Sequence, residues 1–120
     1  MMKIIRGAVC AQNSAESIGQ NAVNLISEII SRNNLDKNAV SAIFFTATED
    51  LNAANPATAV RTQLGLNNVA FMCAQEMTVQ GMLPQCLRVA VFVETDRDAP
   101  TTPVYLGAAA TLRQDLSTSK

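Results

Sequence analysis

The sequence predicts an α+β domain, in which a mixed β-sheet of about five strands is covered by one long helix and a short second helix. Three observations support this fold class. The chain of 120 residues is long enough for one hydrophobic core and too short for two. One early segment has the apolar periodicity of a helix, and most other apolar runs have the length of strands. No internal repeat or linker interrupts this order.

The N-terminal segment predicts a strand followed by the long helix. Residues 2–9 alternate between the two faces of a strand. Asn13 and Glu16 have the spacing of a capping box, and the helix that follows is predicted to continue to about Asn33. The apolar stripe with which this helix covers the sheet consists of Ile18, Ala22, Leu25, Ile26, Ile29 and Ile30.

The middle of the chain predicts a strand, a short helix and another strand. Residues 40–48 are rich in Ile and Phe and form the second strand. The short helix has Asn55 as its N-cap, Pro56 at its first position and Gly65 at its C-terminal end. Residues 69–77 form the third strand.

The last third of the chain predicts two more strands. Gln80 and Gly81 mark a turn, and residues 87–94 form a strand whose valines share one face. A polar loop that contains prolines follows over residues 95–103, and residues 104–112 form the last strand. The predicted element order is therefore β-α-β-α-β-β-β.

Residues 1–113 are predicted to form a single domain, and residues 114–120, which lack periodicity, a flexible C-terminal tail. The cysteines Cys10, Cys73 and Cys86 form no CxxC motif and cannot all pair within one chain, which favours a reducing compartment. The chain starts without a leader-like apolar stretch, and no run approaches the ~20 apolar residues of a membrane span. We therefore expect a soluble, cytoplasmic protein that does not bind membranes.

Charge and residue types exclude several classes of function. The formal net charge is −1 and no run of Lys and Arg occurs, which argues against nucleic-acid binding. The chain has no histidine, which excludes Ser-His and Cys-His nucleophile pairs and zinc sites with histidine ligands. No glycine-rich phosphate loop or metal-ligand spacing is visible. We therefore expect no metal and no other cofactor.

A sheet of this size has two faces, and one long helix covers only one of them. The uncovered face needs another partner, and a second copy of the same chain is the most economical one. The sequence therefore predicts self-association.

Apolar, strand-like runs of the chain carry single polar groups, namely Arg6, Glu76, Arg88 and Tyr105. Removing a charge from water costs several kcal/mol unless a partner compensates, so charged side chains rarely enter such runs. The pattern predicts a charged ligand bound between strands. Alternatives remain open, because Arg88 and Glu76 fit a structural ion pair equally well. Arg6 also fits a solvated arginine, and Tyr105 a core tyrosine.

Cys73 and Glu76 differ in parity along their strand, so their side chains point to opposite faces of a regular sheet. Either a bulge lies between them, or the two side chains serve different sites. A ring-shaped oligomer with a site at each subunit junction would use both faces, and we favour this arrangement. Cys73 on its own also fits a small buried hydrophobe.

Short motifs run along nearly the whole chain. In chain order they are Ile5-Arg-Gly-Ala8, Phe45-Thr-Ala-Thr-Glu-Asp-Leu51, Pro56-Ala-Thr-Ala-Val-Arg61, Cys73-Ala-Gln-Glu-Met77, Cys86-Leu-Arg-Val89, Val104-Tyr-Leu106 and Leu112-Arg-Gln-Asp-Leu116. In this order and spacing they resemble the monofunctional AroH-class chorismate mutases. The resemblance implies a homotrimer that forms a pseudo α/β barrel, with active sites at the subunit interfaces.

The same resemblance implies a reaction and a set of residue roles. The reaction is the rearrangement of chorismate to prephenate, on the route to phenylalanine and tyrosine. Arg6 and Tyr105 would hold a substrate carboxylate. Arg88 would contact the ether oxygen and the nearby carboxylate, while Glu76 and Cys73 would contact the ring hydroxyl.

A pericyclic rearrangement suits a chain with these side chains, because it needs no nucleophile, proton transfer or cofactor. It needs the flexible dianion held in its reactive conformer. It also needs a fixed positive charge where negative charge develops on the oxygen of the breaking C–O bond. Arg88, held in a strand and always protonated, fits this requirement better than a mobile lysine would.

The remaining wall of the implied site consists of Arg61, Ala57, Thr58 and Leu112. Arg113 and the tail are implied to close over its mouth. Arg61 fits a solvent-facing helix position as well as a ligand-facing one. The chain departs from the family pattern at Asn55, where an aromatic residue is usual, and at Thr58, where a lysine is frequent. We therefore expect this wall to be less apolar and less positive than is usual in the family.

Two other functions share parts of the pattern. A trimeric imine deaminase of the Rid type has the same overall architecture, so the fold alone does not separate the two. That family usually carries its arginine in a late strand close to a Leu-Pro ending, whereas this chain has Leu112-Arg-Gln-Asp-Leu116. A non-enzymatic trimer that binds a small anion would keep the arginines without needing Glu76 near them.

Overall fold

The computed structural model describes residues 1–96 and 98–111. The elements in this part of the chain are β1 Met2–Cys10, α1 Ala15–Arg32, the 3₁₀ helix η1 Lys37–Ala39, β2 Val40–Ala47, α2 Pro56–Leu64, β3 Ala70–Gln75, β4 Cys86–Glu94, β5 Val104–Leu106 and the 3₁₀ helix η2 Gly107–Thr111. The order of strands and α-helices is the predicted one. Within the described ranges, no helix is both long and apolar enough to cross a membrane.

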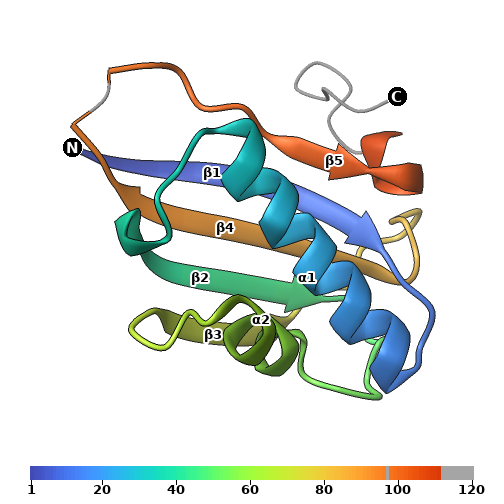
Figure 1. Cartoon of the computed structure of the whole chain (residues 1–120). Coiled ribbons are helices and arrows are strands. Elements are labelled where there is room, and N and C mark those ends of the chain that lie inside the picture. Colours follow the sequence, from blue (N-terminus) through green and yellow to red (C-terminus); the bar gives the residue numbers. More distant parts are fainter. Residues whose placement is uncertain (97, 112–120) are drawn as a thin grey trace.

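The strands form one mixed sheet in the order β3-β2-β4-β1-β5 (Figure 1). Strand β4 pairs antiparallel with β1 on one side and with β2 on the other. The outer strands pair in parallel, β3 with β2 and β5 with β1. The register puts Ala8 of β1 and Thr46 of β2 opposite Arg88 of β4, so side chains from successive strands form rows across the sheet.

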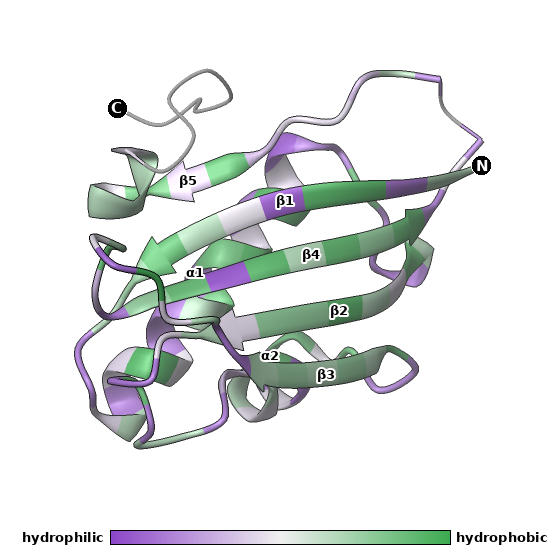
Figure 2. Cartoon of the chain, turned by 180° about the vertical axis from the view of Figure 1, so that it is seen from behind, coloured by the Kyte–Doolittle hydropathy of each residue, from purple (hydrophilic) through white to green (hydrophobic). Residues whose placement is uncertain are grey.

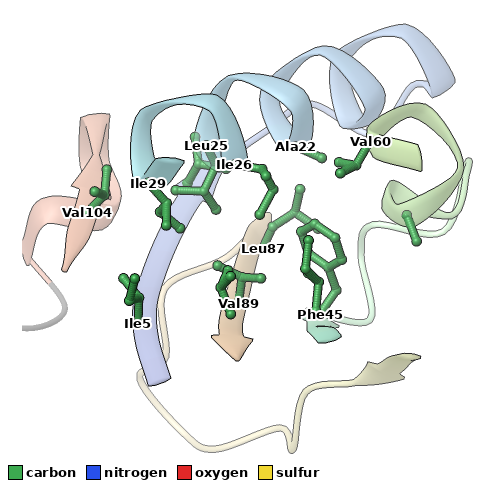
Figure 3. Packing of buried hydrophobic residues seen from close by; sticks show 14 of the residues in the cluster. Ile5, Ala22, Leu25, Ile26, Ile29, Phe45, Val60, Leu87, Val89 and Val104 are labelled. Carbon is green, nitrogen blue, oxygen red and sulfur yellow. The ribbon is translucent and has the colours of Figure 1, made fainter. Parts of the chain in front are cut away.

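Both α-helices lie over the same face of the sheet, where they enclose the hydrophobic core (Figure 1). Alternate residues of β4 point into this core, and each of them is at most 5% exposed: Leu87, Val89, Val91 and Val93. The fully buried residues of α1 that pack against the sheet are Ile18, Ala22, Leu25, Ile26 and Ile29, several of which are drawn in Figure 3. The predicted stripe of α1 is therefore confirmed, with Ile30 partly buried at its edge.

The cap of α1 differs from the predicted one. Ser14, not Asn13, is the N-cap, and its hydroxyl accepts a 3.1 Å hydrogen bond from the Ser17 N–H. Asn13 instead serves the loop before α2, where its Oδ1 accepts 2.9 Å hydrogen bonds from the N–H groups of Asn52 and Ala53. The cap predicted from the capping-box spacing is therefore wrong, because the side chain of Asn13 binds a distant loop and does not cap its own helix.

The cap residues of α2 are as predicted. Asn55 is the N-cap, its Oδ1 accepts a 2.9 Å hydrogen bond from the Ala57 N–H, and Pro56 occupies the first turn. Gly65 ends the helix at its C-cap.

The last strand is shorter than predicted. β5 contains only Val104–Leu106, and the residues Gly107–Thr111 form η2 instead of continuing the strand. Gly107 has a φ of +57°, a left-handed conformation that ends the extended chain and that glycine adopts at little cost. The predicted strand is therefore wrong beyond this glycine. The predicted tail 114–120 lies outside the described residues.

The face of the sheet opposite to α1 and α2 carries no helix across β1, β4, β2 and β3 (Figure 2). We call this surface the open face. Large apolar side chains stand exposed in these strands, with relative exposures of 51% for Met2, 51% for Ile4, 38% for Phe44 and 65% for Met72. The uncovered face that the sequence predicts is therefore present, and it is partly apolar. Self-association through it stays a prediction at this point.

Gly7 of β1 lies where the sheet has the least room for a side chain. A Cβ at this position would lie 2.9 Å from Ile29 Cδ1, 2.9 Å from the Val104 carbonyl oxygen and 3.2 Å from Leu25 Cδ1. We predict that Gly7→Ala lowers the free energy of unfolding by about 1–3 kcal/mol, because the backbone carbonyl cannot move aside easily. Denaturant unfolding of the two proteins measures the difference.

Gly19→Ala is the matched control for this change. It adds the same methyl group to α1, where a Cβ would have one close neighbour, Ala59 Cβ at 3.1 Å. Alanine also favours a helix over glycine by about 1 kcal/mol, which offsets the tighter contact. We expect the control to be close to neutral, and equal losses in the two variants would contradict the prediction.

Candidate active site

Three predicted site residues lie in neighbouring strands of the sheet: Arg6 in β1, Arg88 in β4 and Tyr105 in β5. Ala8 of β1 is opposite Arg88 on one side and Tyr105 on the other, so Arg88, Ala8 and Tyr105 form one row across the sheet. Arg6 precedes Ala8 by two positions and therefore points to the same face. Because α1 and α2 lie on the other side, the two arginines project from the open face.

A shallow hollow of about 230 Å³ lies between these residues. Its lining consists of Arg6, Gly7, Phe44, Thr46, Arg88, Val89, Ala90 and Tyr105. The small side chain of Ala90, which is opposite Arg6 in the sheet, leaves room beside the two guanidinium groups. Arg6 is exposed and has no ion-pair partner among the described residues. The hollow therefore presents two positive charges to any ligand that enters it.

Glu76 follows β3 and contacts two residues that line the hollow, Thr46 and Arg88. Its Oε1 accepts a 2.8 Å hydrogen bond from the Thr46 hydroxyl and lies 3.6 Å from Arg88 Nε. This separation is longer than that of a strong charge-assisted hydrogen bond. The side chain of Arg88 is 51% exposed and that of Glu76 24%, so the pair is partly solvated and worth little by itself.

The ion pair uses only part of the Arg88 side chain. Within residues 1–96 and 98–111, its Nη1 and Nη2 atoms form no ion pair or hydrogen bond. Of the two alternatives that the sequence left open, the ion pair with Glu76 is therefore present, and it leaves the outer nitrogens of Arg88 available. A ligand contact of Arg88 stays a prediction.

Tyr105 is 5% exposed and belongs to a second small core on the side of the hollow. It packs with the buried residues Ala8, Cys86 and Ala109. Ala109 lies in η2, so the 3₁₀ helix that replaces the predicted strand also holds the tyrosine ring in place.

Cys73 points to the other face of the sheet. It pairs with Phe45, a fully buried core residue, and its Sγ–H donates to Asn55 Oδ1 at 3.0 Å. Burial raises the pKa of the Cys73 thiol above its usual value of 9.0, although the backbone N–H of Ala57 offsets part of the effect. Cys73 is therefore a neutral thiol near pH 7. It and Glu76 face opposite sides, as their parity predicts.

The predicted residues of α2 lie on the same side of the sheet as Cys73. Ala57 is 8% exposed and packs into the core, whereas Thr58 and Arg61 are exposed. Their spacing puts Thr58 and Arg61 on one side of the helix. Arg61 has no ion-pair partner in the part of the chain that the structure describes.

The predicted site residues therefore form two groups that the sheet separates. The open-face group consists of Arg6, Glu76, Arg88 and Tyr105, and the α2 group consists of Ala57, Thr58, Arg61 and Cys73. One copy of the chain does not bring the two groups into one cavity. Leu112 and Arg113, also predicted for the site, lie outside the described residues.

Sequence reasoning missed two contacts of the predicted site residues. Thr46 holds Glu76 by its hydroxyl, and Asn55 accepts the thiol proton of Cys73 in addition to capping α2. A signal existed for Thr46, which is one of two polar residues, with Ser41, in the otherwise apolar strand β2. The contact from Asn55 to Cys73 joins segments that are distant in sequence, so it leaves no local pattern.

A second depression, of about 270 Å³, lies where the N-terminal end of β1 meets the loop after β4. Its cations are already engaged, because Lys3 Nζ donates to the Ala99 carbonyl oxygen and Arg32 pairs with Glu28 at 2.7 Å. Among the described residues, no cluster of three or more His, Cys, Asp or Glu side chains could hold a metal ion.

Comparisons with known proteins agree on one family. The family model described as chorismate mutase type I matches residues 2–116. The chain is 38% identical over 122 residues to the chorismate mutase AroH of Bacillus subtilis, covering 100% of this chain and 96% of that protein. It is 35% identical over 123 residues to the chorismate mutase AroH of Thermus thermophilus, with 100% of each covered.

A solved structure is similar as well. A chorismate mutase from Clostridium thermocellum superposes with a TM-score of 0.86 at 37% sequence identity, covering 91% of this chain and 98% of that one.

The buried thiol of Cys86, directly opposite Cys10 in the sheet, gives a testable dependence of stability on pH. Burial raises the pKa of Cys86 from 9.0 to about 12, the nearby Cys10 adds to the shift, and Arg88 opposes it. Between these two pH values the unfolded chain loses the proton while the folded chain keeps it. The free energy of unfolding should therefore fall as the pH rises through this window.

We predict that Cys86→Ala makes this fall less steep, because the variant has no proton to lose at this position. Urea unfolding of both proteins at a series of pH values measures the two slopes. Identical slopes above pH 9 would contradict the role assigned to Cys86.

Proposed function

The chain belongs to the chorismate mutase type I family, and we propose that its active site forms where the open-face group of one copy meets the α2 group of another. As a chorismate mutase it is an isomerase, which rearranges chorismate to prephenate in the biosynthesis of aromatic amino acids. The proposal therefore concerns the residues that carry the reaction and the assembly that completes the site.

One observation supports the catalytic role of Arg88 above the others. The side chain of Arg88 projects from β4, a strand that is paired on both sides. Its Nη1 and Nη2 atoms have no partner within the described ranges. A positive charge fixed in this way stabilises the negative charge that develops on the ether oxygen as the C–O bond breaks. Because the charge is held by the fold before substrate binds, little reorganisation is needed in the transition state.

The neighbouring side chains suit the restraint of a flexible dianion. Arg6 is unpaired among the described residues and, with Tyr105, would hold a substrate carboxylate. Glu76, oriented by Thr46, would accept a hydrogen bond from the ring hydroxyl. Holding the two reacting ends of the substrate in the compact conformer lowers the entropic part of the activation barrier.

A second copy explains two features that one copy leaves unexplained. The exposed apolar side chains of the open face would be covered, and the α2 group of that copy would supply the other wall of the hollow. Cys73 would then reach the ring hydroxyl from the opposite side to Glu76. Ala57, Thr58 and Arg61 would complete this wall. We propose the homotrimer as the assembly, since a closed ring gives every open face such a neighbour.

The family match favours the mutase over the two rival functions, the Rid-type imine deaminase and the non-enzymatic anion-binding trimer. The close approach of Glu76 to Arg88 is also a feature that simple anion binding does not need. We further propose that the chain works in the cytoplasm, where its three cysteines stay reduced.

We predict that Arg88→Ala lowers kcat for chorismate by at least roughly 10²-fold, which corresponds to about 3 kcal/mol of transition-state stabilisation. Arg88→Lys keeps the charge without the planar fork and should retain part of the activity. The loss of chorismate absorbance with purified protein measures the rate. Arg32→Ala, which removes an arginine paired with Glu28 on α1, is the matched control and should leave kcat unchanged.

Two outcomes of this assay would count against the proposal. A wild-type chain that does not consume chorismate at any concentration would overturn the function. Full activity of Arg88→Ala would overturn the role of this residue only.

The shared site predicts that two inactive variants restore each other. Arg88→Ala damages the open-face group and Arg61→Ala the α2 group, so each homo-oligomer has only defective sites. Mixed oligomers contain some interfaces at which both groups are intact. Co-expression of the two variants should therefore recover chorismate turnover, whereas mixing Arg88→Ala with Arg6→Ala, both in the open-face group, should not. A stable monomer at micromolar concentration in light scattering would contradict the assembly.

A further inference from the structure

The segment between Glu76 and Arg88 contains a loop, residues 76–85, that few buried side chains hold in place. Most of its residues are exposed, including Met77 at 75% and Val79 at 56%. Within the loop, the Val79 N–H donates to Met82 Sδ at 3.2 Å. Since hydrophobic burial contributes little here, hydrogen bonds at the two ends of the loop decide its position.

Both ends of this loop are fixed by one short segment, residues 47–50 after β2. At the first end, the Glu76 N–H donates to the Ala47 carbonyl oxygen at 2.8 Å. At the second end, the Gln85 N–H donates to both carboxylate oxygens of Asp50, at 3.1 and 3.0 Å. The same four residues therefore set the distance between the start of the loop and the start of β4.

We call residues 47–50 the anchor of the loop. Within it, Thr48 links Asp50 to the first residue of β4. Its hydroxyl donates to Asp50 Oδ1 and accepts a 3.0 Å hydrogen bond from the Cys86 N–H. The Thr48 N–H donates in turn to the Cys86 carbonyl oxygen at 3.1 Å. Thr48 is 6% exposed, so its hydroxyl is shielded from water. A buried hydroxyl that both donates and accepts in this way fixes the backbone around it.

The anchor acts on a strained residue. Gln85 has a φ of +49°, a left-handed conformation that a residue with a side chain adopts only when its surroundings hold it there. Asp50 accepts a hydrogen bond from the Gln85 N–H, and the Gln85 carbonyl oxygen accepts a 3.0 Å hydrogen bond from the Ala11 N–H. Without Asp50, the strain at Gln85 favours opening of the loop end, three positions before Arg88.

We propose that Asp50 and Thr48 are positioning residues, which fix the backbone at Gln85 and Cys86 and thereby the separation of Glu76 from Arg88. This inference rests on the proposed function, in which both of these charged groups contact the substrate. A carboxylate is suited to the task, because it accepts the strained N–H and the threonine hydroxyl at the same time.

The test combines kinetics with amide hydrogen exchange. In Asp50→Ala, exchange at the Gln85 and Cys86 amides should accelerate by about 10-fold or more, because charge-assisted hydrogen bonds are lost. The kcat for chorismate should fall by about 10-fold, with a smaller change in KM, because a small misplacement of Arg88 affects the transition state most. Thr48→Val should act in the same direction, and Thr48→Ser should retain the wild-type values.

A second change separates positioning from general destabilisation. Gln85→Gly removes the conformational strain, since glycine adopts positive φ freely. In the Asp50→Ala background it should restore most of the lost kcat. Asp36→Ala is the matched control, because Asp36 also accepts a backbone N–H, that of Asn38 at 2.9 Å, at the other end of β2. It should leave kcat and the Gln85 exchange rate unchanged.

The outcomes distinguish this inference from the proposed function. Faster exchange in Asp50→Ala with unchanged kcat would overturn the positioning role, and unchanged exchange would overturn the anchor itself. A wild-type chain without chorismate turnover would overturn the proposed function and the kinetic half of this inference. The exchange measurement would then still decide whether Asp50 holds the loop.

Discussion

The alternation of side chains along β4 is the constraint on which the rest of the structure depends. This strand lies between β1 and β2, and its valines fill the core under α1 and α2. Because successive side chains point to opposite faces, Arg88 must leave the strand on the open face. A shift of one residue would bury the arginine and expose the valines, so the core fixes the direction of the charge.

This geometry explains how a charged residue can stand within an apolar run without being buried. Arg88 follows Leu87 and precedes Val89, yet its side chain is 51% exposed, so one copy of the chain does not bear the cost of burying it. The apolar residues around it belong partly to the core and partly to the open face, where Phe44 and Met72 are exposed. The cost would arise only when a second copy covers the face, and a dianionic substrate would then compensate it.

The polar contacts of the site differ in kind from the packing of the core. Apolar side chains hold the sheet and helices together, while single hydrogen bonds hold the loop that joins Glu76 to Arg88. Asp50 and Thr48 come from a segment that lies far from this loop in the sequence, and their side chains accept the backbone N–H groups of Gln85 and Cys86. Substitution at such positions should therefore affect the rate of reaction more than the stability of the fold.

The sequence by itself determined the order of elements, the stripe of α1 and the split of Cys73 from Glu76, because periodicity and parity are local properties of the chain. It also identified Arg6 and Arg88 as charged residues within apolar, strand-like runs. Only the tertiary structure decided the cap of α1, the end of β5 at Gly107 and the anchor of the loop. These features depend on hydrogen bonds between residues that are distant in sequence, or on a backbone angle that neighbouring residues do not dictate, and no spacing rule encodes them.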